Sequence, residues 1–78
     1  MIRLSGREYL AIFKDEGLER TAEIRSYEQE IKVLEDLAKH YKAEGNQEKY
    51  ETCITEAEAH KWFAIGVAEE NKRAKIEN

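Results

Sequence analysis

The chain has no proline, only four glycines and a single cysteine among its 78 residues. Because proline and glycine interrupt regular structure, their scarcity favours long helices over sheets or loops. The one cysteine, Cys53, cannot form an internal disulfide, and the N-terminal MIRLSGREYL meets charge before any apolar run typical of a signal peptide. We therefore expect a cytoplasmic protein in which Cys53 is a small buried side chain rather than a reactive thiol.

Long apolar runs and an excess of positive charge are also missing. The longest apolar run, Trp62 to Ala68, has seven residues, whereas a membrane-spanning helix needs about 20. Lysine and arginine total 13 against 17 aspartates and glutamates, which leaves a net charge of -4 that repels nucleic-acid phosphates. The composition therefore predicts neither membrane insertion nor direct nucleic-acid binding.

The feature that is present is a helical repeat through the middle of the chain. Apolar side chains recur at alternating steps of three and four residues, at Ile24, Tyr27, Ile31, Leu34, Ala38 and Tyr41. This spacing is typical of one face of a helix. Val33 and Leu37 widen the face toward its C-terminal half. The pattern predicts a central helix whose apolar face, in its second half, is wider than contact with one neighbouring helix requires.

Capping residues mark the ends of the helices. Ser5 and Glu8 have the spacing of a capping box. Gly17 and Gly45 suit the left-handed residue that ends a helix, and Asn46 suits the start of the next one. We expect helices at about residues 5–16, 18–44 and 47–75, with a single bent helix through Gly17 as the open alternative to the first two.

These expectations define an all-α fold with residues 1–78 as a single helical domain. The short connection at Gly45-Asn46 forces an antiparallel helical hairpin of two long helices. The short N-terminal helix should pack at one end, which gives a three-helix, coiled-coil-like arrangement there. We expect Trp62 and Phe63 to anchor this end against apolar side chains of the other two helices, which are Tyr9, Phe13 and Tyr27.

The residues that could carry chemistry are few. Asp36 and His40, and likewise Glu56 and His60, have the four-residue spacing at which a carboxylate and an imidazole can share a metal or a proton. The hairpin places His40 and His60 at different distances from the turn, so the two pairs should not converge. The chain also lacks a glycine-rich phosphate loop. We expect no metal, no cofactor and no enzymatic activity.

Two functions fit these features. The first is a protein–protein interaction module that uses Val33, Leu37 and Tyr41, with Trp62 and Phe63 as further partner contacts if they are exposed. A homodimer is the expected assembly, because so short a chain has a small core. The alternative is an acidic inhibitor that occupies the basic groove of a nucleic-acid enzyme. Its candidate residues are Glu28, Glu35, Asp36, Glu48, Glu51, Glu56 and Glu58.

Overall fold

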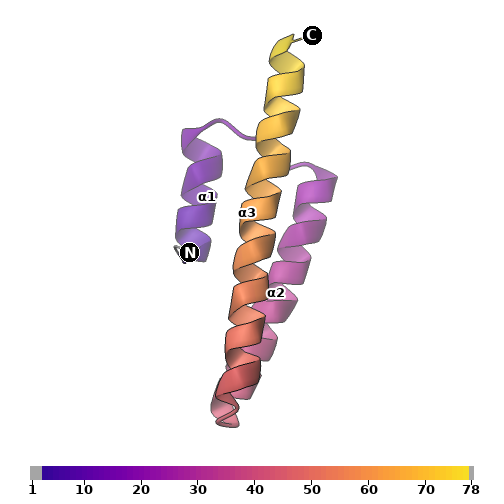
Figure 1. Ribbon diagram of the computed structural model, residues 1–78. Helices are drawn as coiled ribbons and strands as arrows, with labels where there is room; N and C mark the ends of the chain where they lie inside the picture. Colours follow the sequence, from indigo (N-terminus) through magenta and orange to yellow (C-terminus); the bar gives the residue numbers. More distant parts are fainter. Residues whose placement is uncertain (1–2, 78) are drawn as a thin grey trace.

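The structure is a computed structural model that describes residues 3–77. Three helices and no strand are present in this range: α1 (Gly6–Asp15), α2 (Ala22–Ala43) and α3 (Gln47–Glu77). Figure 1 shows α2 and α3 as an antiparallel hairpin, with α1 beside the middle and upper part of α3 and running in the same direction as α3. The all-α class and the hairpin with a short N-terminal helix are thus confirmed.

The first helix begins at its expected cap. The Ser5 hydroxyl accepts a hydrogen bond from the Glu8 backbone N–H at 3.1 Å, and the Glu8 carboxylate accepts one from the Ser5 backbone N–H at 3.3 Å. Gly17 has a φ angle of 63°, the left-handed conformation that glycine adopts without strain. Helix α1 therefore ends where its sequence indicates.

The second helix begins four residues later than expected, at Ala22 rather than Leu18. Thr21 is its N-cap, because the Thr21 hydroxyl accepts a hydrogen bond from the Ile24 backbone N–H at 3.3 Å. Leu18 is buried in the core instead of opening a helix. The alternative of one bent helix through Gly17 is therefore wrong. Helix α3 continues to Glu77, two residues beyond its expected end.

The hairpin turn follows its sequence closely. Gly45 has a φ angle of 78°, and the Asn46 side chain accepts a hydrogen bond from the Lys49 backbone N–H at 3.2 Å. Beyond the turn, α2 contributes a buried row at seven-residue spacing, Ile24, Ile31 and Ala38. The buried side chains on the matching row of α3 are small: Cys53, Ala57 and Ala64. Small residues let the two helices approach closely.

The two ends of the hairpin differ in what they bury. The three-helix end holds one apolar cluster: Leu4, Tyr9, Phe13, Leu18, Ile24, Ala64, Ile65 and Ala68. The remaining buried apolar side chains lie farther toward the turn: Ile31, at the level where α1 begins, and then Ala38, Cys53 and Ala57. Nearly all large buried side chains therefore lie where α1 joins the hairpin. No helix in the described part of the chain is long and apolar enough to cross a membrane.

A polar contact fixes the start of α1 on α3, and we call it the N-terminal clamp. The Glu58 carboxylate accepts the Leu4 backbone N–H at 2.7 and 2.8 Å. The Lys61 ammonium group donates to the Leu4 carbonyl at 2.8 Å and to the Glu35 carboxylate at 3.1 Å. Glu58 and Lys61 are 6% and 5% exposed. Both buried charges are thus compensated by hydrogen bonds.

Candidate docking surface

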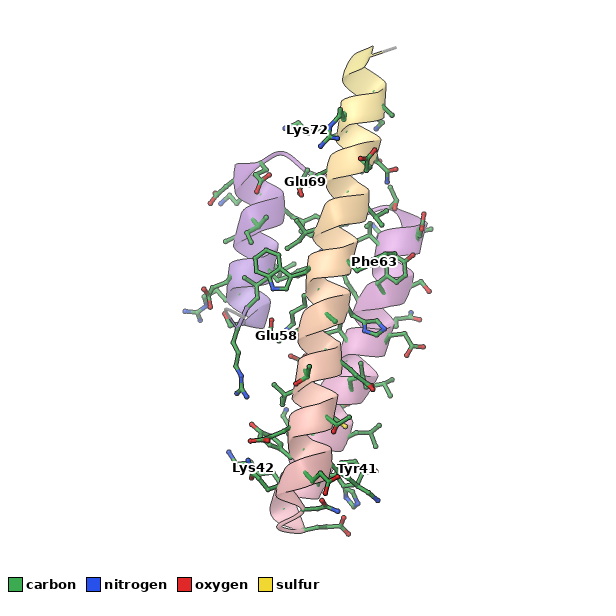
Figure 2. All side chains as sticks on the ribbon, viewed as in Figure 1. Tyr41, Lys42, Glu58, Phe63, Glu69 and Lys72 are labelled. Carbon is green, nitrogen blue, oxygen red and sulfur yellow. The ribbon has the colours of Figure 1, made fainter. Side chains whose placement is uncertain are left out.

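The α2–α3 hairpin has two sides, and α1 covers part of only one of them. On the covered side, the Tyr9 hydroxyl of α1 donates a hydrogen bond to the Glu28 carboxylate of α2 at 2.7 Å. Figure 2 shows Glu58 and Lys42 pointing to this side of α3, and Tyr41 and Phe63 pointing to the other. The second side is not covered by any helix in the described residues.

We call the uncovered side the open face and define it by its apolar residues: Tyr27, Leu34, Leu37 and Tyr41 of α2, with Val33 at its outer edge, and Phe63 of α3. Tyr27, Leu34 and Tyr41 are spaced by seven residues, so they form a row beside the buried Ile24–Ile31–Ala38 row. All three are half-buried. The open face therefore continues the hairpin interface out to the surface.

The exposed part of the open face is made of large apolar side chains. Val33 is 53% exposed, Leu37 is 41% exposed and Phe63 is 57% exposed. The Phe63 ring meets the Tyr27 ring edge-on, with centroids 5.1 Å apart and planes at 84°. Of the expected partner contacts, Tyr41 and Phe63 thus point to one side of the hairpin, Leu37 lies next to them by helical spacing, and Val33 lies at the outer edge of α2. Phe63 is a surface residue rather than the core anchor that its sequence context predicts.

Trp62 lies elsewhere. It is 41% exposed, so the expectation that it packs in the core is wrong. Helix α1 rests on the α3 row Glu58, Lys61, Ile65 and Ala68, which has steps of three and four and leaves position 62 at the edge. Trp62 and Phe63 border an open hollow of about 450 Å³ on the outer surface of α3, together with Gly66 and Val67. Trp62 is therefore adjacent to the open face but not part of it.

Polar groups frame both ends of the open face. The Tyr27 hydroxyl donates a hydrogen bond to the Glu23 carboxylate at 3.0 Å, and this bond raises the pKa of the Tyr27 hydroxyl. Near the turn, the Lys49 ammonium group lies 5.4 Å from the centre of the Tyr41 ring, a cation–π contact. These contacts hold the two terminal tyrosines in place, so the face is shaped before a partner arrives.

The covered side contains an ion pair between the α1–α2 connection and α2. Arg20, in the connection between α1 and α2, donates hydrogen bonds from Nε and Nη2 to the Glu28 carboxylate. The closest of these contacts is 2.6 Å. Partial burial alone would raise the pKa of the Glu28 carboxyl, but the hydrogen bonds from Arg20 and Tyr9 outweigh it and lower that pKa. Burial and the same hydrogen bond to Glu28 raise the pKa of Tyr9. This network is structural, since it ties three segments together.

The histidine pairs do not gather a metal site. The nearest acidic partner of His40 is Glu44, at 3.3 Å, rather than Asp36. The Nδ1–H of His60 donates to the Glu56 backbone carbonyl at 2.7 Å, so this nitrogen is already engaged. Within residues 3–77, no three His, Cys, Asp or Glu side chains lie close enough to bind one ion. Cys53 is buried, as expected.

The carboxylates of the alternative, inhibitory function are divided between the interior and the surface. Glu58 holds the Leu4 backbone, Glu28 binds Arg20 and Tyr9, and Glu35 binds Lys61. The remaining four, Asp36, Glu48, Glu51 and Glu56, are exposed. They extend over α2 and α3 with no single acidic groove formed by all of them in the described residues.

Tyr27 and Leu34 belong to the open face although sequence reasoning did not include them among the partner contacts. The sequence contained the signal for them, because both residues stand at seven-residue spacing with Tyr41.

Comparison with known proteins adds no residues to the open face. Neither a family model, nor a curated protein, nor a solved structure matches this chain.

Proposed function

We propose that this protein is a small non-catalytic helical module that binds another protein through the open face. The observation that carries the proposal is the exposure of the large apolar side chains Leu37 and Phe63 on and beside the half-buried tyrosine row, with exposed Val33 at the outer edge of α2. Singly exposed apolar residues are ordinary, but contiguous ones mark interaction surfaces. The side chains next to them are half-buried aromatics, and aromatic residues are enriched at protein interfaces.

The architecture supports the same function. At the three-helix end, α1 covers one side of the hairpin and buries Tyr9 and Phe13. The opposite side presents an apolar strip from Tyr27 to Tyr41, about 21 Å long by the helical rise. This length is sufficient for four turns of a docked helix, so a partner helix would supply on this side the cover that α1 supplies on the other.

The test is a pair of matched double variants on α2. Val33→Glu/Leu37→Glu places two carboxylates on the open face, whereas Gln29→Glu/Ala43→Glu adds the same charge at exposed positions outside it. We expect helicity by circular dichroism to be retained in both. Proteins captured from extracts of the native cell by the wild type and the control should be lost from the Val33/Leu37 variant, because an unpaired charge cannot be buried in an apolar interface without a large cost.

The oligomeric state of the purified chain belongs to the same experiment. Sedimentation equilibrium would show whether the open face also joins two copies, and a dimer that Val33→Glu/Leu37→Glu dissociates would support use of this surface. Unchanged association and unchanged capture by the folded double variant would overturn the proposal.

A further inference from the structure

We infer that the occupant of the open face is an amphipathic helix of a partner protein whose apolar face is flanked by lysines or arginines. This inference rests on the proposed function and adds the chemistry of the partner. Its basis is the distribution of charge around the hairpin, which is different on the two sides.

The charge separation on α2 follows a seven-residue repeat. Each residue of the buried row Ile24–Ile31–Ala38 is preceded by a residue on the open-face side and followed by one on the side of α1. The preceding residues are Glu23, Glu30 and Leu37, and the following residues are Arg25, Lys32 and Lys39. Since successive residues are about 100° apart, the two rows lie on opposite flanks of the helix. The basic residues of α2, including Lys42, thus avoid the open face.

The flank of α3 has the same sign. Glu56, Phe63 and Glu70 are spaced by seven residues and form the row that borders the open face. Between Tyr50 and Asn71, Lys61 is the only lysine or arginine. It is 5% exposed and is bound within the N-terminal clamp. The central part of the open face therefore has carboxylates on both borders.

Some of the bordering charge is already satisfied. Glu44 contacts His40 at 3.3 Å and Glu70 contacts Arg73 at 3.2 Å. Lys49 lies beside Tyr41, so the end of the open face near the turn carries a positive charge. Glu30 and Glu56 border the middle of the face, and both are exposed. These two carboxylates are in position to select the charge of an incoming helix.

This pattern disfavours a second copy as the occupant. In a twofold dimer each face meets its own duplicate, so the carboxylates that border one copy would approach those of the other. A helix with basic flanks avoids this repulsion and places its cations beside Glu30 and Glu56. The apolar strip supplies the buried area, while the acidic borders supply the choice of partner and its orientation.

The experiment uses two synthetic helices of about 18 residues, long enough to span the face. Both carry leucines at helical spacing; one has lysines on the flanks and the other has glutamates at the same positions. Binding of each peptide to the full chain is measured by fluorescence anisotropy at low and physiological salt. We expect the basic peptide to bind at least about tenfold more tightly than the acidic one, with a difference that shrinks as salt rises.

Two charge-reversal variants locate the effect. Glu30→Lys/Glu56→Lys reverses the borders of the open face, and Glu51→Lys/Glu69→Lys makes the same change in net charge at exposed positions elsewhere; Figure 2 shows Glu69 on the side of α1. The first variant should bind the basic peptide about tenfold more weakly than the wild type does, and the second should bind it almost as tightly. The two variants have the same net charge and differ only in where the charges lie relative to the open face.

The outcomes separate the two proposals. Equal binding of both peptides, abolished by Val33→Glu/Leu37→Glu, would overturn the inference about charge and leave the docking function standing. A wild-type chain that dimerises through the open face and excludes both peptides would likewise replace the partner helix by a second copy. A monomer that binds neither peptide would overturn the inference and count against the proposed function as well.

Discussion

The two ends of the α2–α3 hairpin are built on different principles. The three-helix end buries Tyr9, Phe13 and Ile24 in one cluster, and the burial of large apolar side chains is the main favourable contribution to folding. The end near the turn buries Ile31 and otherwise small residues, while Val33 and Leu37 remain exposed. The comparison shows that the large buried side chains are concentrated where α1 docks. Large exposed apolar side chains occur at both ends: Leu10, Trp62 and Phe63 at the three-helix end, and Val33 and Leu37 toward the turn.

The largest expected effect tests this division directly. Ile24 is 0% exposed at the three-helix end, so Ile24→Ala should lower the free energy of unfolding by about 4 kcal/mol. Ile31→Ala removes the same atoms from a residue that is 6% exposed nearer the turn, and we expect about 2–3 kcal/mol, because fewer large neighbours surround the cavity. Urea denaturation of both variants provides the measurement. An equal or larger loss for Ile31→Ala would show that the stability of the hairpin is not concentrated at the three-helix end.

The next effect concerns the N-terminal clamp. Glu58→Ala removes the acceptor of the Leu4 backbone N–H and leaves that buried N–H without its partner, while Lys61 keeps the Leu4 carbonyl and Glu35. We expect a loss of about 3 kcal/mol, the range for breaking a buried charged contact. Glu56→Ala, an exposed glutamate two residues earlier, is the control and should change stability by less than about 0.5 kcal/mol. If the two variants are equally stable, the clamp contributes nothing to the docking of α1.

Acid should weaken the three-helix end through Glu28. The pKa of its carboxyl is lowered in the folded state, so its contribution is present above the unfolded pKa of about 4.3 and is lost as pH falls through the folded pKa. Glu28→Gln should cost about 1–2 kcal/mol at neutral pH, because it loses the charged bond to Arg20. Urea titrations at neutral pH and at about pH 3 should show the difference between wild type and variant shrinking at low pH. A constant difference would exclude this linkage.

The smallest expected effect is at Trp62. Because the side chain is 41% exposed, Trp62→Ala should cost about 1 kcal/mol, well below the loss for a fully buried tryptophan. Thermal unfolding followed by circular dichroism measures it. A loss as large as that of Ile24→Ala would place Trp62 in the core and enlarge the three-helix end beyond the cluster described above.

The local features of the fold could be predicted from the sequence, because they depend on residues close together in the chain. The capping box at Ser5, the left-handed glycines and the hairpin turn all belong to this class. The start of α2 was missed because the residues around Leu18 are good helix formers. Local preference therefore did not decide between a start at Leu18 and a start after the Thr21 cap. The exposure of Trp62 was missed for another reason: it depends on which α3 face receives α1, and periodicity does not specify that choice.

The polar partners were also beyond local reasoning. In the sequence, Lys32 stands four residues after Glu28 and Lys39 four residues after Glu35, a spacing that favours ion pairs within a helix. In the structure, Glu28 instead binds Arg20 and Glu35 binds Lys61. In the sequence, Lys61 interrupts an apolar helix face, and Glu58 is one of several acidic residues expected on the surface. Their role becomes visible only when Leu4, more than 50 positions away, is placed against them. Val33 and Leu37, by contrast, were identified as surplus apolar residues from the width of their helix face.

The clamp also implies an order of folding events. The Leu4–Glu58 contact joins residues 54 positions apart, whereas the hairpin can grow from its two-residue turn through contacts of steadily increasing separation. Distant contacts require a larger loss of chain entropy before they form. We therefore expect α1 to dock after the transition state, so that Glu58→Ala accelerates unfolding and leaves the refolding rate nearly unchanged, with a φ-value near zero in stopped-flow experiments. The open face would then be assembled on the hairpin before the opposite side receives its cover.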